Sequence, residues 1–269
     1  MICVLFIAFF CSWSHSVRSK GAFMTPPIIY DPVRISVIPD KNPREMVMLR
    51  GCGCKWKKCR FCDYHMDASP DAQANFELNR SVLDLVTGQY GCLEVINSGS
   101  FPELDEATMN YIEKVCIDRG IQRLHFECHW MYRKKCEALR ERFRQKGITI
   151  QLKIGVESFD HEMRENVMVK GMAEDRPEEI ARYFDEICLL FGLTGQSLAS
   201  MEKDIRLGLQ YFKRICINLM LENTAPLKPD AEVIRIFMEN LYPLYRDNPR
   251  VDILLNNTDF GVGGEKDAE

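Results

Sequence analysis

Four cysteines lie within eleven residues, and their type and spacing point most directly to chemistry. They are Cys52, Cys54, Cys59 and Cys62. Thiolates gathered on one short loop bind a metal centre or form disulfides, and do little else. The basic residues around them would favour the thiolate form and offset the negative charge of a bound cluster. These residues are Arg50, Lys55, Lys57, Lys58 and Arg60.

The remaining cysteines indicate a reducing compartment. The chain has 12 cysteines, and those outside the loop are scattered through apolar or helical stretches, as small buried hydrophobic residues would be. Disulfide frameworks belong to small secreted domains, whereas a chain of 269 residues is long enough to bury a core without them. This pattern predicts free thiols and a cytoplasmic protein.

The apolar N-terminus is open to two interpretations. Residues 1–10 (MICVLFIAFF) are apolar like the core of a signal peptide, but no positive residue precedes them and the run is too short to span a bilayer. The other interpretation is a mis-set start, with Met24 opening the protein before Pro26 and Pro27. Export would place a thiolate cluster in an oxidising compartment, which favours the mis-set start. We predict that residues 1–23 are an extension outside the fold and that the protein has no membrane association.

The composition is that of a globular protein, and its net charge does not favour binding to polyanions. Hydrophobic residues make up 46% and charged residues 28% of the chain, and the net charge is −4. A negative net charge gives no support to nucleic-acid binding, although a local basic patch can still provide it.

The elements that would position the cysteines alternate between strand and helix from residue 28 onward. Short apolar runs predict strands, and amphipathic segments predict helices. The predicted strands cover 47–49, 92–96, 123–128, 148–156, 187–191, 215–221 and 251–255. The predicted helices cover 81–87, 105–119, 134–146, 176–185, 200–213 and 230–244. This alternation indicates βαβ units and a parallel sheet in an α/β fold, with room for about six units.

Informative polar strings follow several of the predicted strands. The cysteine loop follows the first core strand, and Asn97-Ser-Gly-Ser100, Glu157-Ser158 and Gly192-Leu-Thr-Gly195 follow later ones. In parallel α/β folds the chemistry lies at the C-terminal ends of strands. The four strings are therefore expected to form one site.

The cysteine loop fits more than one metal centre. Cys59 and Cys62 form a C-x2-C pair, and Cys54 or Cys52 precedes it. Four thiolates would make a closed zinc site or an electron-transfer iron–sulfur centre. Such zinc sites usually combine two separated C-x2-C pairs, and the chain has no second pair. Three thiolates suit a [4Fe–4S] cluster with one iron left open.

The motif Cys54-x4-Cys59-x-Phe61-Cys62 resembles the cluster motif of the radical S-adenosylmethionine (SAM) superfamily, C-x3-C-x-aromatic-C. One extra residue separates the first two cysteines, and Cys52 remains a rival first ligand. Residues 97–102 resemble a segment of the archaeosine-synthase and elongator-like branch.

Two further strings extend the same resemblance. Gly155-Val-Glu-Ser158, with Arg164 and Lys170-Gly171, is similar to the strings around the fourth strand of that branch. Residues 191–197 are similar to its Gly-Leu-Pro-Gly string. The resemblance spans most of residues 44–265.

The resemblance implies that residues 24–269 form a radical SAM core domain, folded as a partial (βα)6 TIM-type barrel. It implies that Cys54, Cys59 and Cys62 hold a [4Fe–4S] cluster whose open iron binds SAM. Reductive cleavage of SAM would yield a 5′-deoxyadenosyl radical that abstracts hydrogen from a substrate the sequence does not identify. A reductant such as flavodoxin or ferredoxin would supply the electron. The implied cofactor-binding residues are Phe61, Tyr64, Ser98, Gly99, Ser100, Glu127, Glu157, Arg164 and Gly192.

The resemblance leaves the substrate and one alternative class open. The related tRNA-modifying enzymes make tRNA one candidate substrate, and the basic helix over 134–146 is the candidate face for it. His125, Cys128 and His129 flank Glu127, but the segment is predicted as strand and loop, which does not secure a second metal site. The alternative is a non-enzymatic zinc- or iron–sulfur-binding α/β protein.

Overall fold

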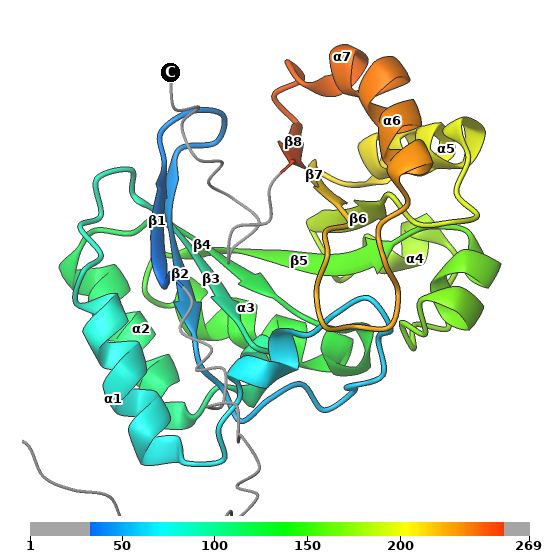
Figure 1. Cartoon of the computed structure of the whole chain (residues 1–269). Helices are drawn as coiled ribbons and strands as arrows, with labels where there is room; N and C mark the ends of the chain where they lie inside the picture. Colours follow the sequence, from blue (N-terminus) through cyan, green and yellow to red (C-terminus); the bar gives the residue numbers. More distant parts are fainter. Residues whose placement is uncertain (1–32, 256–269) are drawn as a thin grey trace, which may run out of the picture. The chain divides into compact units, whose positions relative to one another are not determined.

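The computed structural model describes residues 33–255, so the predicted extension over residues 1–23 lies outside the described residues. In the described part, eight strands form one sheet in the order β1 to β8 (Figure 1). β1 pairs with β2 in antiparallel fashion, and every later neighbouring pair is parallel. The strands are β1 (Ile35–Ile38), β2 (Arg44–Leu49), β3 (Cys92–Asn97), β4 (Arg123–Glu127), β5 (Thr149–Glu157), β6 (Glu186–Phe191), β7 (Arg214–Leu219) and β8 (Val251–Leu254).

Helices follow the strands and cover the outer face of the curled sheet (Figure 1). The helices are α1 (Ala72–Leu83), α2 (Glu106–Asp118), α3 (Cys136–Arg144), α4 (Pro177–Ile180), α5 (Leu198–Tyr211), α6 (Ala231–Asn240) and α7 (Tyr242–Tyr245). Short 3₁₀ segments are η1 (Tyr64–Asp67), η2 (Phe101–Glu103) and η3 (Trp130–Lys135), and η4 (Glu162–Val167) is π-helical. The predicted α/β fold, a partial TIM-type barrel with a parallel sheet, is confirmed. Within residues 33–255 we find no helix that could cross a bilayer.

Alternation along each strand separates an apolar outer face from a polar inner face. Outward-facing residues such as Val95, Phe126 and Leu189 pack with the helices in the main core. Their neighbours point inward, and several of those are charged, including Glu94 and Lys153. Because side chains of a strand alternate between faces, one short sequence can supply both the core and the inner wall of the barrel.

The predicted strands are all present, whereas two predicted helices are not where they were expected. The helix predicted over 81–87 is α1, which begins nine residues earlier, at Ala72, after Asp71, whose side chain accepts a hydrogen bond from the Ala74 amide. The helix predicted over 176–185 is reduced to α4. Apolar and polar residues alternate one by one over 72–79, so the segment lacked the apolar spacing that marks a helix, and its N-cap was the better signal.

Candidate active site

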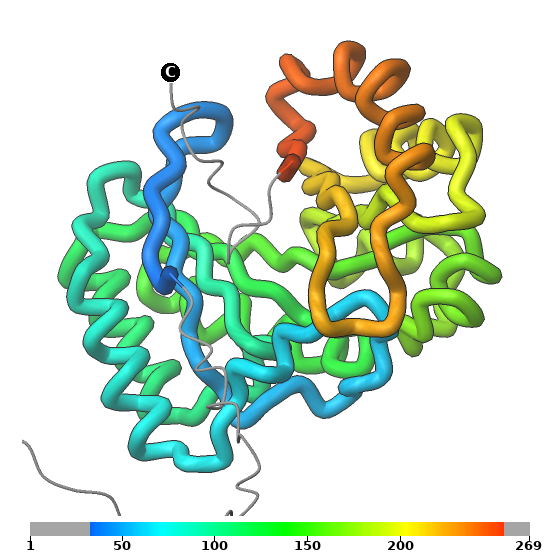
Figure 2. Tube along the Cα trace, in the orientation of Figure 1, coloured from blue at the N-terminus to red at the C-terminus, as the bar shows by residue number. Residues whose placement is uncertain are grey.

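The cysteine loop connects β2 to η1 and is fixed in place by two other loops. The Arg60 amide donates to the Met168 carbonyl at 2.9 Å, and the Arg60 carbonyl accepts from the Leu227 amide at 2.8 Å. The Asn223 side chain also donates to the Phe61 carbonyl at 2.9 Å. The loop after β7 therefore runs beside the cysteine loop, as the traces show (Figure 2). The loop's shape depends on strand ends far apart in the sequence.

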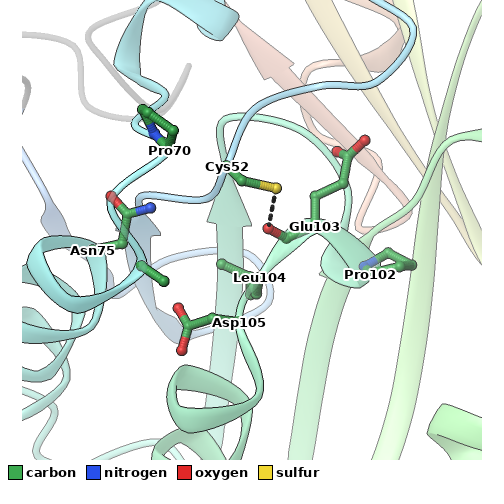
Figure 3. Close-up of a pocket in the computed structure, with 8 residues that line it drawn as sticks. Cys52, Pro70, Asn75, Pro102, Glu103, Leu104 and Asp105 are labelled. Atoms are coloured by element: carbon green, nitrogen blue, oxygen red, sulfur yellow. Dashed lines mark hydrogen bonds between the residues drawn. The ribbon is translucent and has the colours of Figure 1, made fainter.

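Three of the four thiols belong together, and the fourth points elsewhere. Cys54, Cys59 and Cys62 are close enough for the charges of their thiolates to act on one another's pKa. Cys52 instead donates its thiol proton to the Glu103 carbonyl at 3.3 Å and lines a separate cavity of about 130 Å³ (Figure 3). This arrangement favours Cys54 over Cys52 as the first ligand.

The donor set fits a [4Fe–4S] cluster better than a zinc ion. All three thiols are free, and burial raises the pKa of Cys62 to about 12, so the thiol needs a bound metal to ionise at neutral pH. Among the residues that the structure describes, no three His, Cys, Asp or Glu side chains converge on a single ion position. Zinc requires such convergence, whereas each cysteine of a cluster ligates a different iron.

The segment Ser98–Ser100 lies directly against the cysteine loop. A Cβ on Gly99 would lie 3.1 Å from the Cys54 Cα and closer still to the Glu103 carboxylate, so only glycine fits. Ser98 accepts from the Gly51 amide at 3.2 Å, and Ser100 accepts from the His129 amide at 2.9 Å. The predicted binding segment and the cysteine loop thus share one wall.

Glu103 ties this wall together, and sequence reasoning did not include it in the site. Its carboxylate accepts from the Ser100 amide and the Lys55 amide, both at 2.6 Å, and from the Tyr132 hydroxyl at 3.0 Å. The Glu103 side chain is buried. A signal for it was present, because Ser100 followed three residues later by Glu is the capping-box pattern.

A second wall is built around Glu157 at the end of β5. Glu157 has φ of 65° beside a bulge, a strained conformation for a residue other than glycine. Its carboxylate binds Lys170 Nζ at 2.6 Å, and this ammonium also lies 5.5 Å from the centre of the Phe61 ring. A Cβ on Gly155 would lie 2.6 Å from the same Nζ. Two predicted residues, Glu157 and Phe61, therefore meet through Lys170.

Arg164, Gly192 and Tyr64 have local contacts that explain their positions. Arg164 is fully buried, and its guanidinium binds Glu165, Asp175 and the Ser158 carbonyl. Gly192 has φ of 96° and packs against Ile234 of α6. The Tyr64 amide donates to the Cys62 sulfur. For Arg164 and Gly192, shaping the loops accounts for these contacts, and their direct cofactor contact stays a prediction.

The inner wall of the barrel carries a buried network of ion pairs. Glu94 is bound by Arg44 and Lys153. Arg214 binds Glu186 at 2.8 Å and Asp252 at 2.7 Å. His125 contacts Glu186 at 3.3 Å. His129 has a different partner, because its Nε2 lies 2.9 Å from the Lys170 carbonyl. The acidic side chains in these pairs are therefore already bound by arginine or lysine.

Glu127 differs from the other acids of the inner wall. It ends β4, and Lys153 Nζ at 3.8 Å is its one ionic contact within residues 33–255, where it makes no hydrogen bond. Burial raises the pKa of this carboxyl. An acid without hydrogen bonds at the C-terminal end of a barrel strand is available to a ligand.

Comparison with known proteins includes a partial match to a curated protein and an extensive match to a solved structure. No family model matches the chain. An uncharacterized protein of Methanocaldococcus jannaschii is 24% identical in an alignment of 157 positions that covers 52% of this chain and 43% of that protein. The chain thus spans less than half the length of this curated relative. The structure of a queuine lyase from Clostridium spiroforme, bound to SAM and queuine, is 44% identical with a TM-score of 0.82, and the match covers 87% of this chain and 100% of that chain.

Proposed function

The chain is an enzyme of the radical SAM superfamily with a [4Fe–4S] cluster and SAM as cofactors, and from this we propose that it cleaves queuine or a closely similar base. The observation that carries the proposal is 44% identity along the entire length of a chain described as a queuine lyase. The narrower likeness to the archaeosine-synthase and elongator-like branch stays a prediction.

The three thiols would hold the cluster, and the two walls beside them would hold SAM. When bound, the cluster and SAM supply a one-electron cleavage that generates a 5′-deoxyadenosyl radical. Backbone and hydroxyl groups of Ser98–Ser100 would receive the amino-acid end of SAM. Glu157 would accept hydrogen bonds from ribose hydroxyls, because its strained backbone and the Lys170 ammonium fix where the carboxylate points.

Glu127 would bind the substrate base rather than SAM. Queuine is a 7-deazaguanine, and the ring N–H and exocyclic amino group of such a base are adjacent donors. An ionised carboxylate can accept from both, as in other paired, charge-assisted hydrogen bonds. Glu127 has the free acceptor oxygens for this role, whereas Glu94, Glu186 and Asp252 are already bound by arginine or lysine.

The direct test is anaerobic incubation of the reconstituted enzyme with SAM, a reductant and queuine. We expect queuine to be consumed together with SAM, with 5′-deoxyadenosine and a smaller 7-deazaguanine product detected by mass spectrometry. Queuosine-containing tRNA in place of the free base is the matched comparison. Formation of 5′-deoxyadenosine with no loss of queuine would exclude this substrate while leaving the radical chemistry intact.

A further inference from the structure

Five exposed lysines lie on two segments beside Cys54. Lys55, Lys57 and Lys58 belong to the cysteine loop, and Lys134 and Lys135 belong to η3. We refer to them as the lysine surface. None of the five forms an ion pair with any residue in the described ranges, whereas several lysines elsewhere on the protein do. The paired examples are Lys114, Lys146, Lys213 and Lys228.

The two segments form one continuous surface because their rings and backbone meet. Trp56 of the cysteine loop stacks on His129, with ring centroids 5.9 Å apart. The Lys55 amide and the Tyr132 hydroxyl donate to the same oxygen of Glu103. Lys58 Nζ lies 5.0 Å from the centre of the Trp56 ring, and Lys135 Nζ lies 5.5 Å from that of Tyr132.

The surface also has the mixed composition of a protein interface. Met131, which belongs to η3 like Lys134 and Lys135, is 39% exposed, and the rings of Trp56 and Tyr132 are half-buried. Methionine and aromatic residues are enriched at protein interfaces.

The rest of the chain is acidic, since the net charge is −4 with these lysines included. Arg140, Arg142 and Arg144 of the adjoining α3 are already paired with acidic residues, so the unpaired positive charge is confined to a small area. A compact acidic protein suits such a limited basic surface better than a long polyanion.

We propose that the lysine surface docks a small acidic one-electron donor protein, which delivers its electron beside Cys54. The inference rests on the proposed function, because a reductive cleavage needs a donor. Lys55 directly follows Cys54, so a partner held by these lysines would be brought close to a predicted cluster ligand. Complementary charge mainly accelerates encounter and orients the partner, and salt weakens both effects.

The test compares two charge-reversed variants of the full chain, assayed anaerobically with reduced flavodoxin or with dithionite. Lys134→Glu/Lys135→Glu alters the lysine surface at two exposed residues of η3, outside the cysteine loop. Lys203→Glu/Arg206→Glu makes the same change in net charge on exposed residues of α5. We expect only the first variant to lose about tenfold or more of the flavodoxin-supported rate of 5′-deoxyadenosine formation at low ionic strength, and to keep its dithionite-supported rate within about twofold.

Calorimetric titration with flavodoxin keeps docking separate from the chemistry. The first variant should show a dissociation constant at least about tenfold weaker than that of the α5 variant, with the difference shrinking in high salt. Equal dissociation constants of the two variants for flavodoxin would overturn the proposal. The same titration with tRNA would also overturn it if the first variant lost tRNA binding and kept its affinity for flavodoxin. A wild-type enzyme that cannot cleave SAM with dithionite would instead refute the proposed function, and the titration would still decide the docking.

Discussion

The Cys52 thiol lies in its own cavity and donates to a backbone carbonyl, while Cys54 faces Cys59 and Cys62. We therefore expect Cys54→Ser to lose most of the iron bound after anaerobic reconstitution, because a cluster short of one of its three ligands is poorly held. Cys52→Ser should keep its iron. Iron content per chain and the visible absorption band measure this, and the reverse outcome would make Cys52 the first ligand.

Glu127 is the second residue whose role a single substitution can decide. Glu127→Gln should weaken queuine binding about tenfold or more, because it removes a charged acceptor, while SAM binding stays unchanged. The pKa of Glu127 is raised by burial, so wild-type binding of queuine should weaken as pH falls through that pKa, and the variant should lose this dependence. Titrations without reductant measure both ligands.

Glu157→Gln is the matched control for Glu127→Gln. It should weaken SAM binding and leave queuine binding nearly unchanged, because Glu157 lies on the wall assigned to the cofactor. If Glu127→Gln lowers SAM affinity and spares queuine, Glu127 is a cofactor contact, as the sequence predicted.

At the scale of elements, η2 joins the cysteine loop to η3 through one buried carboxylate. Glu103→Gln keeps the shape but replaces an acceptor oxygen with a donor amide, which cannot accept from the Lys55, Ser100 and Tyr132 donors together. We expect a loss of about 1–3 kcal/mol in unfolding free energy, because a buried donor is left without a partner. Urea denaturation followed by circular dichroism measures it.

Glu106→Gln on α2 is the comparison for Glu103→Gln, because Glu106 is exposed and its ion pair with Arg142 lies at the surface. It should cost less than about 1 kcal/mol. Equal losses from the two substitutions would show that η2 does not depend on its buried carboxylate.

The elements that sequence predicted well are those whose pattern is local. The apolar runs of β3 and β6 and the N-cap and closing glycine of α2 can be identified within a few residues. The contact between Glu157 and Lys170 depends on a bulge and on a π-helical segment. Neither feature produces a repeating pattern of apolar residues that could be recognised in the sequence. The distinction between Cys52 and Cys54 depends on where Glu103 lies. Such contacts follow from tertiary packing, which a single sequence does not reveal.

At the scale of the whole chain, the ion pairs of the polar inner wall lie within the strands whose C-terminal ends carry the predicted site. Arg44, Glu94, Lys153, Arg214 and Glu186 come from five strands, yet they form one connected set of ion pairs. Breaking a buried pair leaves an uncompensated charge, so each strand's position is tied to that of its neighbours. The ion pairs therefore help to fix the register of the strands, and with it the positions of Glu127 and Glu157 at the strand ends.

This wall should make folding sensitive to acid. The hydrogen bond to His125 and the charge of Arg214 outweigh burial and hold the pKa of Glu186 at about 2, and the pKa of Glu94 also lies well below its usual range. A carboxyl whose pKa is lower in the folded state stabilises the fold above its unfolded value of 4.5, and this stability is lost as pH falls toward 2. For Glu186 alone the loss is about 3 kcal/mol. Glu186→Gln should therefore flatten the fall in unfolding free energy between these limits, measured by urea denaturation at several pH values. An unchanged slope would mean that Glu186 titrates in the folded protein as it does in the unfolded chain, and that its ion pairs are not what acid disrupts.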